Sequence, residues 1–318
     1  MKSSGSAPWD VTAATLVVGA PGYRRVTRVG SVAGRFAPSP SGDLHLGNLR
    51  TAILAWLFAR ADGRPFLLRV EDLDRQRSRA EFEASQLADL AALGLDWDGP
   101  VVRQSERDPL YAAALERLTA AGLTFECFCT RREIAEAVSA PHGPPGSYPG
   151  TCRDLTESER EARRAERSPA IRLRARERTW TIRDELHGEI EGHVDDLVLR
   201  RGDGAHAYNL AVVVDDADQD VDQVVRGDDL LDAAPAQAYL THELGAPEPA
   251  YAHVPLALNA DGRRLAKRDG DVTLRDLSPE HAWDLIGTSL GVAARSPEAL
   301  LAELDPREIS REPWIVTF

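Results

Sequence analysis

The sequence has few lysines and few aromatic residues, and it contains no long apolar run. Among the 38 basic residues of the 318-residue chain only Lys2 and Lys267 are lysine, and aromatic residues make up 6%. No stretch approaches the ~20 consecutive apolar residues of a membrane helix, so we expect no spanning segment. With 43% apolar and 28% charged residues, the composition is that of a globular chain long enough for more than one domain.

Positive charge is also in short supply. The 38 basic residues face 51 acidic ones, which gives a net charge of −13. This balance argues against a protein that coats nucleic acid by charge alone, although a local basic face remains compatible with RNA contact. The N-terminus lacks the charged start and the apolar core of a signal peptide, so we expect a cytoplasmic protein.

A βαβ unit is predicted near the start of the patterned chain. Residues 1–33 are rich in Gly, Ser, Ala and Pro without a clear period, and they predict a loose extension. Residues 34–39 and 65–70 predict two short strands, and residues 46–62 carry apolar residues at helical spacing between them. The order strand, helix, strand implies a parallel sheet with a right-handed crossover.

Further helices and strands are expected on both sides of a loop-rich segment. They comprise helices at 79–93, 108–121, 228–244 and 279–291, a hairpin at 197–204, a strand ending at 224–227 and a strand at 254–258. Residues 153–183 hold ten Arg against six acids; they could face RNA phosphates, but the interleaved Glu favours a solvated helix. An open α/β sheet split by an insertion binds its ligand at the carboxyl ends of its strands.

The first motif is Arg35-Phe-Ala-Pro-Ser39-Pro-Ser-Gly-Asp-Leu-His45-Leu-Gly47-Asn48. A glycine-bearing loop that leads into a helix N-terminus offers free N–H groups to a phosphate. His45 would add a side-chain donor, and Gly47 would leave room for an adenine or ribose. For a lone His-x-Gly, a capped turn with an incidental histidine is the commoner explanation.

The second motif is Arg263-Arg-Leu-Ala-Lys267-Arg-Asp-Gly270. A lysine in such a loop can stabilise charge that develops on a transferring phosphorus and a departing pyrophosphate. A solvated surface loop is the alternative. Because Lys267 is the only lysine after position 2, we favour a functional role.

The third constellation is the cysteine cluster, in which Cys127, Cys129 and Cys152 lie within 26 residues. Structural zinc takes four ligands in a tetrahedron, and either His142 or Tyr148 could supply the fourth. Zinc chemistry alone favours His142. Three reduced, buried thiols are the alternative. A zinc ion held here would be structural and would pin a Pro-rich segment with little core of its own.

The motifs together resemble those of class I aminoacyl-tRNA synthetases. The segment His45-Leu-Gly-Asn48 looks like their "HIGH" motif, and Arg264-Leu-Ala-Lys267-Arg268 looks like their "KMSKS" motif. The glutamyl branch is the closest match, carried by the Arg35 segment and by Arg69-Val-Glu71-Asp72, Ala207-Tyr208-Asn209-Leu210-Ala and Val225-Arg226-Gly227. The match runs from about residue 34 to 270. Asn48 and Arg264 depart from the pattern, and neither implies loss of activity.

The resemblance implies an α/β fold with a Rossmann-type parallel sheet, split by a zinc-bearing insertion and followed by a short C-terminal helical part. The expected divisions are an extension 1–33, a catalytic first half 34–124, an insertion 125–190, a catalytic second half 191–258, and a loop with helical segment 259–318. Only 48 residues follow Gly270, so the chain is similar to the truncated glutamyl-queuosine tRNA(Asp) synthetases.

Such enzymes activate L-glutamate with ATP without tRNA, then attach it to the queuosine base in the anticodon loop of tRNA(Asp). The resemblance thus implies L-glutamate, ATP with Mg²⁺ and queuosine-bearing tRNA(Asp) as partners of a monomer. Two alternatives stay open: a truncated enzyme that charges tRNA(Glu), and a non-catalytic paralogue that binds glutamate or ATP.

The resemblance also assigns residues to the glutamate site. Arg35 and Arg226 would bind the two carboxylates, Glu71 would bind the ammonium, and Ser39 and Tyr208 would donate or accept hydrogen bonds. Guanidinium groups suit this task because they pair with carboxylates through two parallel hydrogen bonds. The alternative for any one arginine is a surface salt bridge.

Two further sets of residues follow from the same resemblance. His45 and Lys267 would be catalytic, and together with Gly47 and Asn48 they would bind ATP. One structural zinc would be held by Cys127, Cys129, Tyr148 and Cys152, so here the resemblance favours Tyr148 over His142.

Overall fold

A computed structural model describes residues 32–130, 132–134, 147–263, 265 and 272–316. Its main sheet has seven strands in the order β3-β2-β1-β9-β10-β6-β7. They are β1 (Ala33–Phe36), β2 (Phe66–Val70), β3 (Val102–Arg103), β6 (Thr179–Asp184), β7 (Gly188–His193), β9 (Val221–Gly227) and β10 (Ala250–Val254). All neighbours pair in parallel except β6 and β7, so the predicted α/β fold with a parallel main sheet is confirmed.

The chain order of the sheet reverses at β1. From this strand the chain continues to β2 and β3 on one side, whereas β9 and β10 lie on the other. In open α/β sheets ligands bind beyond the carboxyl ends of the strands at such a switch point. Arg35 on β1, Arg226 on β9 and Glu71 directly after β2 therefore belong to the same edge of the sheet.

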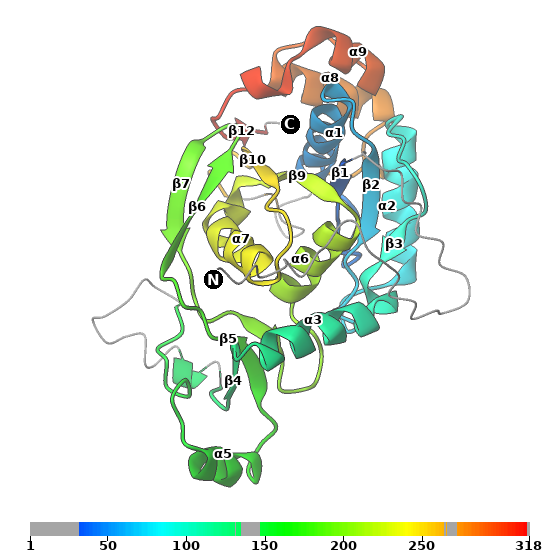
Figure 1. Ribbon diagram of the computed structural model, residues 1–318. Coiled ribbons are helices and arrows are strands. Elements are labelled where there is room, and N and C mark those ends of the chain that lie inside the picture. The colour runs from blue at the N-terminus through cyan, green and yellow to red at the C-terminus, as the bar shows by residue number, and fades with distance from the viewer. Residues whose placement is uncertain (1–31, 131, 135–146, 264, 266–271, 317–318) are drawn as a thin grey trace.

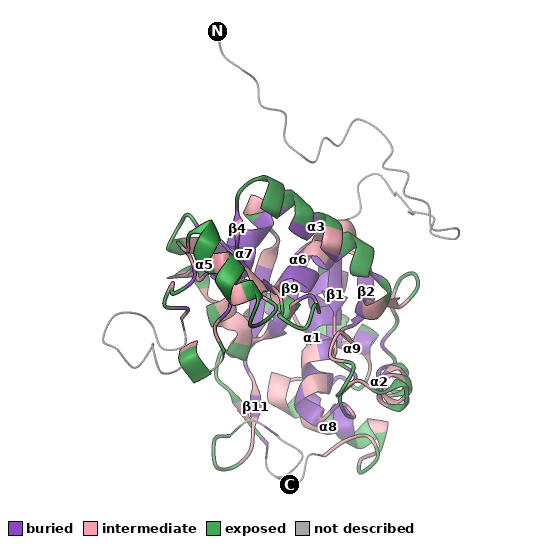
Figure 2. Cartoon of the chain, turned by 90° about the horizontal axis from the view of Figure 1, so that it is seen from below, coloured by how far each residue is buried: buried purple, intermediate pink, exposed green. Residues whose placement is uncertain are grey.

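Helix α1 (Leu46–Ala61) forms the centre of the largest buried cluster. Its apolar residues are buried on almost every side, because the helix packs between β1 and the C-terminal helices α8 (Pro279–Leu290) and α9 (Pro297–Glu303). A Cβ atom at Gly34 would lie only 2.8 Å from Ala59, so glycine permits this close approach of helix and strand. Figure 2 shows α1, β1 and β9 as mainly buried.

The remaining helices complete the layers around the sheet. They are α2 (Ala80–Ala92), α3 (Asp108–Ala120), α6 (Tyr208–Asp218) and α7 (Ala234–Glu243), with short 3-10 turns at Gln104–Glu106, Asp228–Ala233 and Pro306–Glu308. The predicted helices near 46–62, 79–93, 108–121 and 279–291 are confirmed within one or two residues. No helix in the described ranges is both long and apolar enough to cross a membrane.

A separate three-stranded sheet carries the cysteines. It consists of β4 (Thr124–Cys127), β5 (Ala170–Leu173) and β8 (Val198–Arg200), all antiparallel, and the short helix α5 (Glu157–Arg164) lies beyond it (Figure 1). This insertion lies between strands of the main sheet. The hairpin β6–β7 at residues 179–193 pairs with β10 of the main sheet. The boundaries of the insertion and of the two catalytic halves given in the sequence analysis stay a prediction.

Two expectations about local structure are wrong. Residues 153–183 do not form one solvated helix: only Glu157–Arg164 is helical, and β5 and most of β6 follow. The Thr156–Glu159 capping box starts this helix, and Pro169 precedes the next strand. Residues 254–258 do not form one strand, because Pro255 lacks an N–H and separates β10 from β11 (Ala257–Leu258).

A separate two-stranded sheet forms near the C-terminus. Strand β12 (Trp314–Ile315) pairs in parallel with β11, which precedes the loop that holds Lys267. The N-terminal extension, apart from Val32 and Ala33, lies outside the described residues, as does Lys267. The predicted turn near residue 204 is present, since Arg200 forms an isolated antiparallel bridge with His206.

Candidate active site

An open cleft of about 680 Å³ lies where the main sheet faces the insertion. Ser39, Glu71 and Tyr208 line it from the catalytic side, and Cys127 and Cys129 line it from the insertion. Three of the residues expected to contact glutamate therefore share one cavity with two of the expected metal ligands. The size of the cleft exceeds what a single amino acid needs, so a larger molecule can enter beside it.

Arg35 is not among the residues that line this cleft, and it lies buried in an ion-paired network. Its Nε lies 3.3 Å from Asp216 Oδ1, and its Nη1 donates to the carbonyl of Val225 at 3.2 Å. The fully buried Arg69 lies 2.8 Å from the same Asp216 oxygen. Burial raises the pKa of Asp216, but the charges of Arg35 and Arg69 outweigh it and hold that pKa below its usual value. Asp216 is therefore a fixed anion.

The neighbouring Asp215 is the second anion of the network. It accepts from Arg107 at 2.6 Å, from Gln104 at 2.8 Å and from the Tyr111 hydroxyl at about 2.9 Å. These partners come from the segment that leads into α3, and Asp215 itself lies in α6. The Asp215–Asp216 pair thus ties α6 and α3 to the floor of the site through buried, charge-assisted hydrogen bonds.

Glu71 lies at the end of β2, where it meets both the cleft and the network. Its carboxylate lies 3.6 Å from Arg69, and its backbone N–H donates to the Pro38 carbonyl at 2.9 Å. Burial raises the pKa of Glu71 to about 7, against the opposing charges of Arg69 and Arg35. A carboxylate with this pKa in a cleft is typical of a functional site. A cationic partner such as an ammonium group would stabilise the charged form of Glu71, which burial disfavours.

Tyr208 shows that the expected glutamate ligands gather around one point. Its side chain is 39% exposed at the first turn of α6, in the cleft. Desolvation of the phenol is the larger cause that raises the pKa of Tyr208, and the negative charge of Glu71 is the smaller one. The positive charges of Arg226 and Arg35 lower this pKa. Charges of both signs therefore lie within electrostatic range of this one hydroxyl group.

Arg226 is almost fully buried, and its contacts differ in kind from those of Arg35. Its Nε donates to His253 Nε2 at 3.0 Å, its Nη1 donates to Gln237 Oε1 at 2.7 Å, and its Nη2 donates to the Leu230 carbonyl at 3.3 Å. Its guanidinium also lies over the Tyr251 ring, 5.6 Å from the centroid. Every one of these partners is uncharged.

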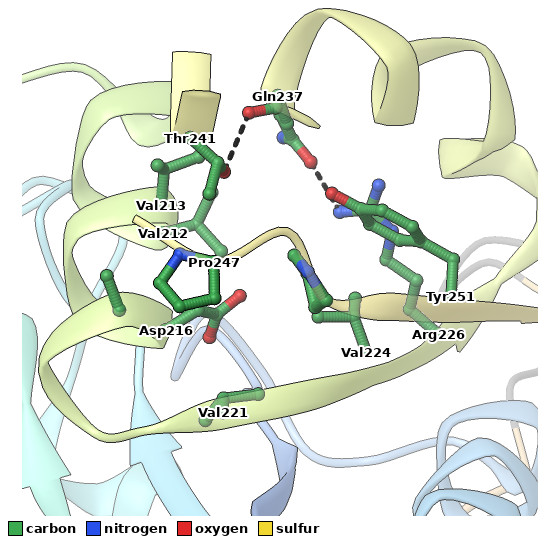
Figure 3. Close-up of a pocket in the computed structure, with 12 residues that line it drawn as sticks. Val212, Val213, Asp216, Val221, Val224, Arg226, Gln237, Thr241, Pro247 and Tyr251 are labelled. Carbon is green, nitrogen blue, oxygen red and sulfur yellow. Dashed lines mark hydrogen bonds between the residues drawn. The ribbon is translucent and has the colours of Figure 1, made fainter. Parts of the chain in front are cut away.

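A small enclosed cavity lies behind Arg226 (Figure 3). Its volume of about 10 Å³ has room for about one water molecule. Its wall combines Val212, Val213, Val221 and Val224 with Asp216 and Arg226, and its small volume leaves no room for a substrate. The figure shows Gln237 between Thr241 and the guanidinium of Arg226. We therefore assign substrate binding to the open cleft, not to this cavity.

His45 and Asn48 cap the N-terminus of α1 reciprocally. His45 Nδ1 accepts from the Asn48 N–H at 3.2 Å, and Asn48 Oδ1 accepts from the His45 N–H at 3.4 Å. Asparagine in place of the second histidine of the motif thus completes a capping box. When neutral, His45 must carry its proton on Nε2, because Nδ1 acts as an acceptor. A Cβ at Gly47 would lie about 3 Å from the His45 ring and from Ala257.

The loop that holds Lys267 begins and ends next to His45. At its start Asn259 forms a closed turn with Arg263, after β11. At its end the Leu46 N–H donates to Val272 at 3.0 Å, and Thr273 bridges to His45. Leu265 is buried in the same apolar cluster as α1. Lys267 lies outside the described residues, but the chain on both sides of it is fixed to this helix.

The three cysteines lie together as the sequence predicts. Their sulfur atoms all lie within 4.8 Å of one another, so the cluster could hold a metal ion such as zinc. The Tyr148 hydroxyl lies 3.4 Å from Cys127 Sγ and 3.9 Å from Cys129 Sγ, and Cys129 Sγ lies 3.5 Å from Cys152 Sγ. His142 lies outside the described residues.

These distances fit a tetrahedral ion. With zinc–sulfur bonds of about 2.3 Å and zinc–oxygen bonds of about 2.0 Å, neighbouring sulfurs lie about 3.8 Å apart and sulfur and oxygen about 3.5 Å apart. The Cys152 N–H also donates to the Tyr148 oxygen at 2.8 Å, which fixes its position. Burial and the neighbouring Cys127 raise the pKa of Cys129 to about 12. Without a metal this pKa favours the protonated thiol of Cys129, so a cation that binds here must displace that proton.

Two arginines lie beside the cysteine cluster. The Arg172 guanidinium lies 3.9 Å from the centroid of the Tyr148 ring, and Arg163 donates to Cys152 Sγ at 3.7 Å. Three thiolates around a divalent ion leave a net negative charge. The two guanidinium groups are placed to balance it, which adds to the fit between this donor set and zinc.

Several residues of the site were not singled out from the sequence. Asp215 and Asp216 are not predicted as site residues, although two adjacent acids within an apolar helix are a usable signal of buried ion pairs. His253 and Asp184 were missed altogether. The histidine is the single polar residue of the buried strand Ala250–Val254 apart from Tyr251, but its partner is 69 residues away and no local pattern connects them.

Comparisons with known proteins agree with this geometry. Residues 31–285 match the family of tRNA synthetases class I (E and Q), catalytic domain. A glutamyl-Q tRNA(Asp) synthetase from Nocardia farcinica is 66% identical over 291 residues, or 90% of this chain and 93% of the relative. One from Symbiobacterium thermophilum is 46% identical, over 88% of this chain and 94% of the relative.

A solved structure is also similar. The glutamate tRNA ligase from Elizabethkingia meningosepticum, crystallised with its amino acid, superposes with a TM-score of 0.77 at 26% identity. The match covers 90% of this chain and 67% of that protein. The fold therefore has a counterpart in a solved structure over nearly the whole chain.

Proposed function

The chain belongs to the glutamyl-Q tRNA(Asp) synthetases, within the class I glutamyl and glutaminyl tRNA synthetase family, and we propose that it activates L-glutamate with ATP and transfers it to queuosine in tRNA(Asp). It is a ligase. The observation that carries the proposal is that Ser39, Glu71 and Tyr208 line one cleft, while Arg35 and Arg226 lie on the neighbouring strands β1 and β9 of the main sheet.

Glutamate recognition follows from the charges of the site. A molecule with two carboxylates and one ammonium needs two cationic contacts and one anionic contact. Arg35 and Arg226 supply the cations, and Glu71 supplies the anion. Tyr208 and Ser39 line the cleft and provide hydroxyl groups for the remaining polar atoms. The fully buried Arg69 and Asp216 keep Arg35 in place.

The first reaction forms an acid anhydride. An oxygen of the glutamate α-carboxylate attacks the α-phosphorus of ATP, a new phosphorus–oxygen bond forms, and the bond to pyrophosphate breaks. Glutamyl-adenylate and pyrophosphate are the products. No group of the enzyme forms a covalent bond, so its contribution is positioning and stabilisation of charge.

The nucleotide is placed at the N-terminus of α1. The helix dipole favours phosphate at this end of α1, where the Leu46 and Asn48 N–H groups already have acceptors, and His45 can contribute its Nε2–H while its Nδ1 caps the helix. Gly47 keeps the backbone accessible beside the His45 ring. Lys267, which lies outside the described residues, would stabilise the leaving pyrophosphate, as the family resemblance implies. ATP takes part as its Mg²⁺ complex.

The second reaction uses the open part of the cleft. A hydroxyl of the queuosine cyclopentenediol attacks the activated carbonyl, and AMP leaves. The cleft of about 680 Å³ lies between the sheet edge and the insertion, so a nucleobase can reach the adenylate from the insertion side. The insertion is held by one structural zinc, with Cys127, Cys129 and Cys152 as ligands and Tyr148 as the fourth.

Transfer of labelled glutamate to defined tRNAs tests the function. We expect label on tRNA(Asp) that carries queuosine and none on the same tRNA with guanosine at that position, nor on tRNA(Glu). Charging of tRNA(Glu) at its 3′ end would instead support a truncated glutamyl-tRNA synthetase. Absence of both transfer and glutamate-dependent ATP–pyrophosphate exchange would identify a non-catalytic paralogue.

A further inference from the structure

A buried chain of hydrogen bonds leads from Arg226 away from the cleft. Arg226 Nε donates to His253 Nε2 at 3.0 Å, and His253 Nδ1 lies 2.6 Å from Asp184 Oδ2. Arg226 and His253 occupy paired positions on the adjacent strands β9 and β10, and Asp184 ends β6, the next strand along. Three consecutive strands therefore each contribute one member of the chain Asp184–His253–Arg226.

The donor and acceptor roles along this chain are fixed. A guanidinium nitrogen can only donate, so His253 Nε2 must accept and carries no proton. The single imidazole proton then lies on Nδ1 and is donated to Asp184. Asp184 also accepts the N–H groups of Leu186, His187 and His253, at 2.9, 2.9 and 3.0 Å. His253 is therefore the neutral tautomer, and it cannot rotate without breaking bonds on both sides.

The charged and titratable groups around His253 agree with this assignment. They are Asp184 at the end of β6, His187 just after it, Arg226 on β9, and Tyr251, whose ring stacks on the imidazole at 5.8 Å. Burial lowers the pKa of His253, and Arg226 lowers it further, although the hydrogen bond to Asp184 acts in the opposite direction. A second proton on His253 would point directly at the guanidinium.

The consequence concerns the charge of Arg226. Its three hydrogen-bond acceptors are an imidazole nitrogen, the Gln237 amide oxygen and the Leu230 carbonyl, all neutral. Throughout the ranges that the structure describes, no carboxylate oxygen lies within 4.0 Å of its nitrogens, whereas Arg35 is paired with Asp216. A buried cation without an anion is costly unless a ligand supplies one.

We propose that His253, oriented by Asp184, and Gln237 act as positioning residues that hold Arg226 as a cation with no carboxylate in direct contact and thereby select a carboxylate over an amide in the substrate. This inference rests on the proposed function, because it takes Arg226 as a glutamate ligand. It adds a reason why a carboxylate is preferred over an amide. The neutral acceptors orient the guanidinium of Arg226, and its positive charge stays available to pair with a carboxylate of the substrate.

The substitution Gln237→Glu tests the charge directly. It keeps the shape of the side chain but places an anion at the atom 2.7 Å from Arg226 Nη1. We expect the KM for glutamate in ATP–pyrophosphate exchange to rise at least about tenfold, as expected for a lost charge-assisted contact. The KM for ATP should stay within about twofold of the wild-type value, and the preference for glutamate over glutamine should fall.

A matched pair at His253 tests the positioning. In His253→Asn the amide lies near the former Nδ1, so it can still bond Asp184 but does not reach Arg226. In His253→Gln the amide extends toward the former Nε2 and can supply an acceptor. We expect the Asn variant to raise the KM for glutamate about tenfold and the Gln variant to recover part of it. His281→Asn, at an exposed position on α8, is the control.

The outcomes separate this inference from the proposed function. If wild-type protein gives no glutamate-dependent exchange, the proposed function fails. If it does, an unchanged KM for glutamate in Gln237→Glu overturns the inference, as does an equal rise in the KM values for glutamate and ATP. Thermal unfolding of each variant is measured in parallel, and should His253→Asn not fold, the isosteric Gln237→Glu variant decides the question.

Discussion

The glutamate site and the cysteine cluster are both groups of polar side chains withdrawn from water, but they are held in different ways. Arg35 and Arg69 both pair with Asp216 within the chain, on a sheet packed against the large apolar cluster around α1. The cysteine cluster lies on the small sheet, where the buried side chains that pack together are Phe125, Cys127, Phe128, Tyr148 and Cys152.

The difference teaches where each region obtains its stability. In the main body, apolar burial and internal ion pairs preform the pocket before any ligand arrives. In the insertion, most of the small core consists of the candidate metal ligands themselves, so a metal bound there would join β4 to the segment around Cys152. We therefore expect the two regions to fail independently.

The largest effect should come from Arg226→Ala. Removing the guanidinium deletes the contact to a carboxylate and leaves His253 and Gln237 without their donor, so kcat/KM for glutamate in exchange should fall by about 10² to 10³-fold. Zinc content should not change. A matching fall in zinc content would show that the two regions are not independent.

Cys152→Ser should lower the zinc content and leave glutamate-dependent exchange nearly unchanged. Serine is a poor zinc ligand, so metal content measured by atomic absorption should drop from about one to near zero per chain. Glutamate-dependent exchange should persist within a few-fold, while transfer to queuosine-bearing tRNA should fall at least about tenfold. Retention of full zinc stoichiometry would contradict the assignment of this ligand.

The pH dependence of glutamate use sharpens the role of Glu71. Its pKa of about 7 lies above the ordinary value of 4.5, so the carboxylate becomes charged only as the pH rises through about 7. Below that pH it is neutral and binds an ammonium weakly. We expect kcat/KM for glutamate to rise about tenfold from pH 6 to pH 7.5 in the wild type. In the Glu71→Gln variant kcat/KM should be low and should not change with pH over this range. A wild-type profile that is flat there would rule out this role.

Tyr148→Phe should give the smallest change. The phenol oxygen is one ligand of four, and water can occupy a vacated position on zinc, so we expect metal affinity to fall roughly tenfold with the metal still bound at micromolar concentration. Competition with a chromophoric chelator measures this. An affinity equal to that of the wild type would remove Tyr148 from the ligand set and return attention to His142.

Much of the framework could be predicted from the sequence because its signals are local. The α1 helix was readable from its apolar spacing, and the cysteines from their clustering. The hairpin β6–β7 is not predicted from the sequence: Trp180 and Ile182 alternate with polar residues along β6, but Ile190 is the only large apolar residue of β7, and the pairing of β6 with β10 is non-local. The Asp184–His253–Arg226 chain was missed because three strands distant in sequence meet only in the folded sheet.

ATP–pyrophosphate exchange with each of the twenty amino acids tests the central claim most directly, since it reports the pocket alone and needs no tRNA. The paired cations and Glu71 predict exchange with glutamate and background values with glutamine, aspartate and the others. Exchange supported equally by glutamine, or by an amino acid without a second carboxylate, would contradict a pocket built around Arg35 and Arg226.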